Sequence, residues 1–169
     1  MNHLILFYIG SHPDSRGRLL AEILEQDDYW LEVTHDYIQW LFPNKEKSRV
    51  TPGAPTITKE IQEEFLNDEI LQQHLKASFN RMLAFYGLVD TGSGIKKSEN
   101  WERKKSNWFV KDTHNNLRIT RILKSLRSLG LETEAIKFHE ALVELAETEK
   151  DCGIGEAAQR FWAEAVKNA

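Results

Sequence analysis

Three polar side chains with complementary chemistry share one predicted helix. Apolar spacing predicts a helix over Tyr29–Phe42, and His35, Asp36 and Gln39 fall on its narrow polar strip. The rest of that helix, which includes Trp40, is apolar, so we expect most of it to be buried. If the strip faces a cleft, it supplies a titratable ring, a carboxylate and an amide in one place. If it faces solvent, it serves only solubility.

A second polar stripe lies on a helix nearer the C-terminus. His114, Arg118 and Arg121 follow one another at helical spacing beside an apolar face. A guanidinium offers a planar fork for a carboxylate or phosphate, and the nearby helix N-terminus adds partial positive charge. The functional interpretation is therefore an anion-binding stripe. The alternative is an internal ion pair, for example with Asp36 or Glu32.

An adjacent histidine–aspartate pair is also typical of metal-dependent phosphohydrolases built from helices. His35 and Asp36 would then need ligands from other helices, for which His12 and His114 are candidates. A metal-dependent hydrolase is therefore the alternative to a binding protein. No HExxH or CxxC spacing occurs, and residues 92–94 lack the spacers of a nucleophile elbow. We predict no catalytic residue, no metal site and no cofactor.

Charge and composition restrict the partners and the compartment. The net charge is −4, yet basic residues concentrate between Lys96 and Arg127, interleaved with Trp101 and Trp108. Such a block could bind an anion. The negative net charge of the chain and the lack of a recognised nucleic-acid-binding module argue against a nucleic-acid partner. The single cysteine, Cys152, favours a reducing compartment, and no apolar run approaches the roughly 20 residues of a membrane span. We expect a soluble cytoplasmic protein, of unknown oligomeric state.

The apolar pattern predicts a single domain over residues 1–169 with an all-α fold. We expect a compact bundle of about seven helices, an extended N-terminal segment at Leu4–Ile9, and two long loops at Pro43–Ile57 and Leu88–Glu99. Gly87 should end the longest of the early helices. Caps and apolar spacing place the helices over residues 16–26, 29–42, 58–66, 68–86, 100–109 and 113–129, then from Thr133, and over 156–166.

Several segments resemble the conserved region of the opioid growth factor receptor family. Their order and approximate spacing agree with the family from Phe7 to Leu131, which is most of the chain. The most specific of them is the run HDYIQWLFP. The matching segments are His35–Pro43, Ala54–Pro55, Arg81–Gly87, Asn100–Trp101 with Arg103, and His114–Leu123.

The resemblance implies a shared fold and a binding surface. Animal members of the family are described as receptors for an enkephalin peptide, are associated with the nuclear envelope, and carry a longer C-terminal sequence. We expect a stand-alone relative that acts as a receptor-like binding module for a small anionic or peptide ligand. The predicted ligand contacts are His35, Asp36, Gln39, Trp40, Asn100, Trp101, Arg103, His114, Arg118 and Arg121.

Overall fold

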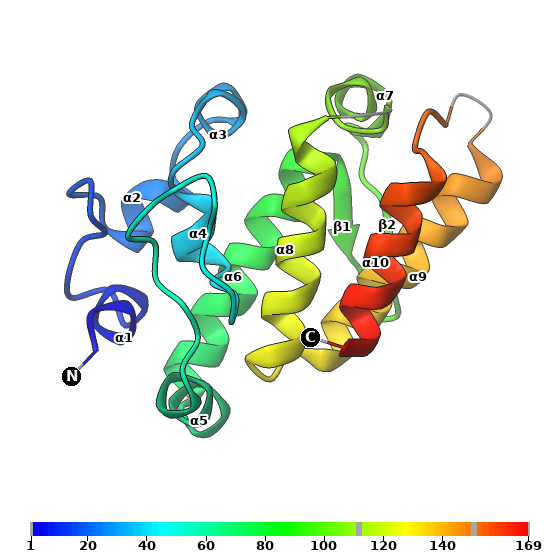
Figure 1. Cartoon of the computed structure of the whole chain (residues 1–169). Helices are drawn as coiled ribbons and strands as arrows, with labels where there is room; N and C mark the ends of the chain where they lie inside the picture. Colours follow the sequence, from blue (N-terminus) through cyan, green and yellow to red (C-terminus); the bar gives the residue numbers. More distant parts are fainter. Residues whose placement is uncertain (1, 111–112, 150–151, 169) are drawn as a thin grey trace. The chain divides into compact units, whose positions relative to one another are not determined.

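The computed structural model describes residues 2–110, 113–149 and 152–168. Its contacts separate the chain into two compact units, Met1–Ser78 and Phe79–Ala169. The described residues form ten α-helices, one short 3-10 helix and one two-stranded hairpin (Figure 1). The prediction of a mostly helical fold is therefore confirmed, and the hairpin corrects its all-α class. The assignment of a single domain stays a prediction.

Short helices dominate the first unit. Several of their starts are fixed by side chains that accept a backbone N–H which the helix itself leaves unpaired. Asp27 accepts from the Trp30 amide at 2.8 Å, and Thr58 accepts from the Ile61 amide at 3.2 Å. The helices are α1 (His3–Tyr8), α2 (Leu20–Leu24), α3 (Asp28–Val33), α4 (Ile38–Leu41), α5 (Lys59–Asn67) and the first part of α6 (Glu69–Tyr86).

The N-terminal apolar run forms helix α1, so the prediction of an extended segment is wrong. Asn2 caps this helix by accepting a hydrogen bond from the Leu4 amide at 2.8 Å. Leu4, Ile5, Phe7 and Tyr8 are all buried, and residues at this spacing share one helical face. Periodicity alone does not distinguish such a short apolar run from a strand.

The helix predicted over residues 29–42 is two short helices, α3 and α4. Thr34 ends α3 in an extended conformation, with φ −101° and ψ 127°. The chain turns back after this point, and the Tyr37 hydroxyl donates a 2.8 Å hydrogen bond to the Leu31 carbonyl. Both α3 and α4 contribute apolar side chains to the same core, so apolar residues continue across the break. This continuity is why the sequence predicted one helix.

The helix predicted over residues 16–26 is also shorter, and α2 begins only at Leu20. The Asp14 carboxylate accepts hydrogen bonds from the amides of Arg16 and Arg18, at 2.9 and 3.0 Å. These bonds hold the preceding residues in a turn, because an aspartate side chain competes with the helix for local backbone donors.

Tyr8 lies in the core of the first unit. Its hydroxyl donates to the Leu41 carbonyl at 2.5 Å and lies 3.0 Å from the Ser78 hydroxyl. Its backbone carbonyl lies 2.5 Å from a ring nitrogen of His74. Burial raises the pKa of the Tyr8 hydroxyl. This residue therefore ties α1 to both α4 and α6 through polar bonds inside an otherwise apolar core.

Three helices form the main body of the second unit. Helices α8 (His114–Ser128), α9 (Glu132–Thr148) and α10 (Glu156–Asn168) pack against one another, each antiparallel to the one before (Figure 1). Trp162 of α10 is buried, and its indole N–H donates to the Asn116 carbonyl at 3.0 Å. Helix α7 (Trp101–Lys104) and a 3-10 turn (Lys105–Asn107) precede them.

The second predicted loop contains an antiparallel hairpin. Strands β1 (Leu88–Asp90) and β2 (Ile95–Lys97) pair with one another, and β2 lies against α9. The Thr91 amide donates to the Gly94 carbonyl at 2.9 Å, which closes a two-residue turn. Three-residue strands are too short to show a clear alternation of apolar and polar residues, so the sequence did not indicate them.

Side chains from the α7 region close the C-terminal end of α6. The Lys104 ammonium donates to the Ala84 carbonyl at 2.6 Å, and the Trp108 indole donates to the Tyr86 carbonyl at 2.8 Å. Gly87 follows with φ 82°, the left-handed conformation common after a helix, so its predicted role as the end of this helix is confirmed. These bonds supply partners for carbonyls that the helix leaves open.

Candidate functional site

The break between α3 and α4 places the predicted His–Asp pair beside an open cavity of about 370 Å³ in the first unit. His35 is exposed and Asp36 is half-buried. The cavity lies between this turn and the loop that precedes α5. Its lining residues are Val33, Thr34, His35, Asp36, Val50 and Thr51.

An ion-pair network occupies the Asp36 carboxylate. Arg18 donates to it at 2.9 Å, and Arg16 lies 3.4 Å from its other oxygen. Arg18 also holds the fully buried Asp14 carboxylate, with contacts of 2.9 and 2.8 Å. Partial burial alone would lower the pKa of Arg18, but its hydrogen bonds to Asp14 and Asp36 raise it. Asp36 therefore serves the local structure, with its charge balanced by two guanidinium groups.

Replacing Arg18 with lysine should lower the free energy of unfolding by about 1.5–3 kcal/mol, the value of hydrogen bonds to charged groups. A lysine has one ammonium group and cannot bridge Asp14 and Asp36 as the planar guanidinium does. Urea unfolding of the variant measures the effect. Arg16→Lys is the matched control, because the Arg16 side chain is exposed and its guanidinium pairs with Asp36 alone among the described residues. Equal destabilisation by the two substitutions would show that the network does not depend on Arg18.

Gln39 and Trp40 lie in the interior of the first unit. The Gln39 amide donates to the His35 carbonyl at 3.1 Å, and Trp40 packs edge-on against the rings of Phe7 and His3. Sequence reasoning placed Gln39 on the polar strip and expected the face that includes Trp40 to be buried, and it named both residues as ligand contacts. The structure brings together His35 and Asp36 alone at the cavity, and makes Gln39 and Trp40 part of the core beneath it.

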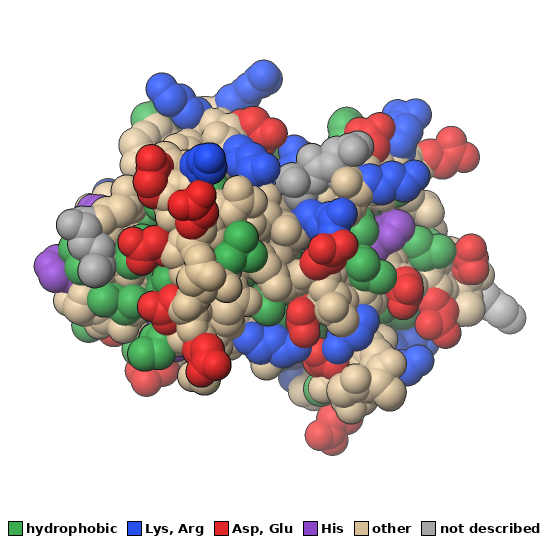
Figure 2. Space-filling view, turned by 90° about the horizontal axis from the view of Figure 1, so that it is seen from below, with side chains coloured by type: hydrophobic (Ala, Val, Ile, Leu, Met, Phe, Trp, Pro, Cys, Tyr) green, Lys and Arg blue, Asp and Glu red, His purple; other side chains and the backbone are tan. Residues whose placement is uncertain are grey.

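The predicted residues around α7 are divided between surface and core. Asn100 and Arg103 are exposed, whereas Trp101 is buried and packs edge-to-face against Trp108 and Phe109. Trp101 therefore acts as a packing residue of the second unit. Figure 2 shows the face seen from below Figure 1, on which lysine, arginine, aspartate and glutamate side chains are interspersed.

The stripe predicted on α8 also divides. His114 is exposed at the start of the helix, Arg121 is half-buried, and Arg118 is only 5% exposed. The Arg118 guanidinium lies 3.5 Å from the Asn115 side-chain oxygen. Sequence reasoning placed Arg118 at the border of the apolar face, and the structure places it inside that border. Pairing of either arginine with Asp36 or Glu32 stays a prediction.

His114 contributes to a cavity of about 320 Å³ between α8 and α10. Two large apolar side chains on its wall face solvent, since Leu117 is 70% exposed and Phe161 is 51% exposed. Large apolar side chains exposed beside a cavity are typical of binding surfaces. The complete lining is Thr113, His114, Asn116, Leu117, Thr120, Ala157, Ala158 and Phe161.

Two polar atoms on this wall lack hydrogen-bond partners in the described part of the chain. They are the Thr113 hydroxyl and the Asn116 side-chain oxygen, and both are buried. Thr113 stands at the N-cap of α8 but does not cap it. The Asn116 amide nitrogen donates to the Val110 carbonyl at 3.3 Å, which leaves its oxygen as the open acceptor. A buried polar atom without a partner costs about 1–3 kcal/mol, so such atoms in a native structure require an explanation.

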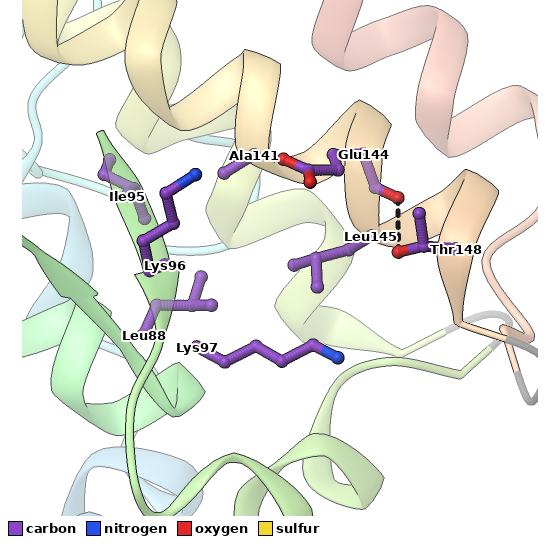
Figure 3. A pocket seen from close by; sticks show the side chains of 8 residues that line it. All are labelled: Leu88, Ile95, Lys96, Lys97, Ala141, Glu144, Leu145 and Thr148. Carbon is purple, nitrogen blue, oxygen red and sulfur yellow. Dashed lines mark hydrogen bonds between the residues drawn. The ribbon is translucent and has the colours of Figure 1, made fainter. Parts of the chain in front are cut away.

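A third cavity, of about 400 Å³, lies between the hairpin and α9 (Figure 3). Sequence reasoning missed it because it treated the hairpin as a loop. Next to it, Lys97 forms an ion pair with Glu149, and the hydrogen bond from Lys97 lowers the pKa of that carboxyl. The cavity is lined by Leu88, Ile95, Lys96, Lys97, Ala141, Glu144, Leu145 and Thr148.

The described residues show neither a metal centre nor a membrane span. Among them, no group of three or more His, Cys, Asp or Glu side chains is placed to hold a metal ion. No described helix combines the length and the apolar character that crossing a membrane requires.

The chain matches a family model over almost its whole length. The conserved region of the opioid growth factor receptor family aligns with residues 5–168, and the chain belongs to this family. The opioid growth factor receptors of Rattus norvegicus and Homo sapiens are 42% and 41% identical over 122 residues, which is 69% of this chain. Opioid growth factor receptor-like protein 1 of Mus musculus is 40% identical over 142 residues, or 78% of the chain.

These relatives are much longer than the matching region. The match covers 21% of the rat receptor, 18% of the human receptor and 30% of the mouse receptor-like protein. No solved structure is detectably similar to the chain.

Proposed function

We propose that the chain is a receptor-like binding module whose ligand occupies the cavity between α8 and α10. The observation that carries this proposal is the pair of buried polar atoms, on Thr113 and Asn116, that lack partners among the described residues and lie beside exposed apolar side chains. A ligand that supplies hydrogen-bond donors here would relieve their desolvation cost. The relatives named as receptors support a binding role for the family's conserved region.

The wall of the cavity defines the chemistry of the ligand. Leu117 and Phe161 would cover an apolar group, and the Asn116 oxygen accepts a hydrogen bond from an N–H or O–H donor. The N-terminus of α8, where Thr113 and His114 line the cavity, favours a negatively charged group on the ligand. A short peptide, or an acylated amino acid with a free carboxylate, combines these three features.

Binding can be tested with a thermal-shift screen of N-acetylated amino acids and dipeptides that carry a free carboxylate. A probe at a hundredfold over its dissociation constant should stabilise the protein by about 2.7 kcal/mol. For the best probe, Leu117→Gln should weaken binding about tenfold, because burying a leucine contributes about 1.5–3 kcal/mol. Titration calorimetry measures the change.

Val143→Gln provides a matched control, because Val143 is an exposed aliphatic residue on α9 and does not line this cavity. Its affinity for the probe should equal that of the unmodified protein. If the two variants bind equally well, the ligand lies elsewhere. If no probe of this class binds, the proposed ligand chemistry is wrong.

A further inference from the structure

The hydrogen bonds of the hairpin determine which backbone groups of β2 point away from β1. The Thr91 amide donates to the Gly94 carbonyl at 2.9 Å, and the Ser98 amide donates to the Gly87 carbonyl at 2.8 Å. In an antiparallel pair, hydrogen-bonded positions alternate with positions that are not bonded. Lys96 therefore bonds to β1, whereas the N–H and C=O groups of Ile95 and Lys97 point outward.

The backbone groups on the outward edge of β2 are unbonded in the described part of the chain; Lys97 is exposed there, and Ile95 is 4% exposed. No described residue forms a hydrogen bond with the backbone groups of Ile95, and none does so with those of Lys97. An edge with unpaired backbone groups is a template for another strand. A strand added to such an edge gains affinity from main-chain hydrogen bonds and specificity from its side chains.

The cavity beside this edge has room for a side chain of the added strand. Successive residues of a strand point to opposite faces of the sheet, yet Ile95, Lys96 and Lys97 all line the same space. That space therefore extends along the strand's edge. In Figure 3, β2 forms one side of it and α9 the other, and Leu88 and Leu145 approach one another across its floor.

The charges on β2 indicate which side chains an added strand should carry. Lys96 is exposed and forms no ion pair with any described residue, while the Lys97 ammonium is held by Glu149. Residues directly opposite one another in neighbouring strands share a face of the sheet. The residue opposite Lys96 should therefore be acidic. The residue of the added strand that lies opposite Ile95 would share the face of the sheet that is turned toward α9, so it should be apolar.

We propose that β2 binds an extended segment of a partner polypeptide as a third strand, with adjacent apolar and acidic residues opposite Ile95 and Lys96. The apolar side chain enters the cavity between β2 and α9, and the acidic side chain pairs with Lys96. This surface is separate from the cavity between α8 and α10, and the proposal does not depend on a ligand there.

The test uses a terminally blocked eight-residue peptide of alternating threonine and valine with a central leucine–glutamate pair. Nuclear magnetic resonance of the full chain should show added hydrogen-exchange protection at the amides of Ile95 and Lys97, and no change at the Lys96 amide. Methylating the two peptide nitrogens that face β2 should weaken binding at least about tenfold, because it removes main-chain donors. Unchanged affinity of the methylated peptide would overturn strand addition.

A charge reversal tests the assigned residue pair. Lys96→Glu should weaken binding of the glutamate peptide about threefold and strengthen binding of a lysine peptide, as expected for an exposed ion pair. Arg160→Glu, an equal charge change on α10, should alter neither. Equal effects of both variants would overturn the pairing with Lys96.

Three further outcomes would overturn this proposal. Spectral changes at Leu117 and Phe161 alone would assign the peptide to the other cavity and overturn the β2 site. Protection of Ile95 and Lys97 that appears at high protein concentration without peptide would identify a second copy of the chain as the occupant, and would overturn the peptide assignment. Absence of any change with the peptide also overturns it.

Discussion

Replacing Trp40 with alanine is expected to lower the free energy of unfolding by about 3–5 kcal/mol. The side chain is only 3% exposed and packs edge-on against Phe7 of α1 and His3 at its start. Its removal leaves a cavity between α1 and α4 that neighbouring side chains only partly fill, and the transfer energy of the indole is lost as well. Urea unfolding followed by circular dichroism measures the loss.

Tyr29→Ala is the matched control for this substitution. Tyr29 is a large aromatic residue of α3 in the same unit, but it is 74% exposed. Its truncation should change stability by no more than about 0.5 kcal/mol, as is usual at the surface. If Trp40→Ala costs less than about 1 kcal/mol, Trp40 is not packed as the structure shows.

Gly87→Ala is expected to destabilise the chain by about 2–4 kcal/mol, for two reasons that add. Gly87 has φ 82°, a conformation that costs an alanine about 1–2 kcal/mol. A Cβ atom at this position would also lie 3.1 Å from the Trp101 Cα and 3.2 Å from the Lys104 Cβ. The helix that follows would have to move, which would strain the Lys104 and Trp108 bonds to the end of α6.

Gly92→Ala separates these two contributions. Gly92 has a similar φ of 89°, but nothing lies within 4 Å of the place where its Cβ would be. Gly92→Ala should therefore lower the free energy of unfolding only by the cost of the backbone conformation, about 1–2 kcal/mol. Thermal or urea unfolding of both variants gives the difference. A cost at Gly92 equal to that at Gly87 would contradict the close approach of α7 to Gly87.

The long helices could be predicted from the sequence because their signals are local. Thr58 caps α5, and Gly87 follows the last turn of α6, as the residue types indicate. The short helices could not be predicted, since contacts distant in sequence decide their ends. Arg18, which reaches Asp36 from eighteen residues away, is an example: the turn at Asp36 depends on a partner that no local pattern reveals.

The surroundings of the named site residues could be read from the sequence only in part, for a related reason. The structure places His114 at a cavity and Trp40, Trp101 and Arg118 in the interior, and their contact with a ligand stays a prediction. Helical spacing assigns a residue to a face of its helix and does not reveal what covers that face. The Asn116 oxygen and the outward backbone groups of β2 have no partners among the described residues. Both features depend on how elements pack, so neither could be read from residue types.

Helix α6 limits where the chain can be divided into recombinant fragments. Leu71 and Leu75 are buried in the first unit, and Phe79 and Met82 are buried in the second, yet all four belong to one uninterrupted helix. A fragment cut at residue 78 would leave each half with a truncated helix of two or three turns, too short to form by itself in water. The two units are thus distinct in their contacts but share a backbone element, and a recombinant fragment of either must include all of α6.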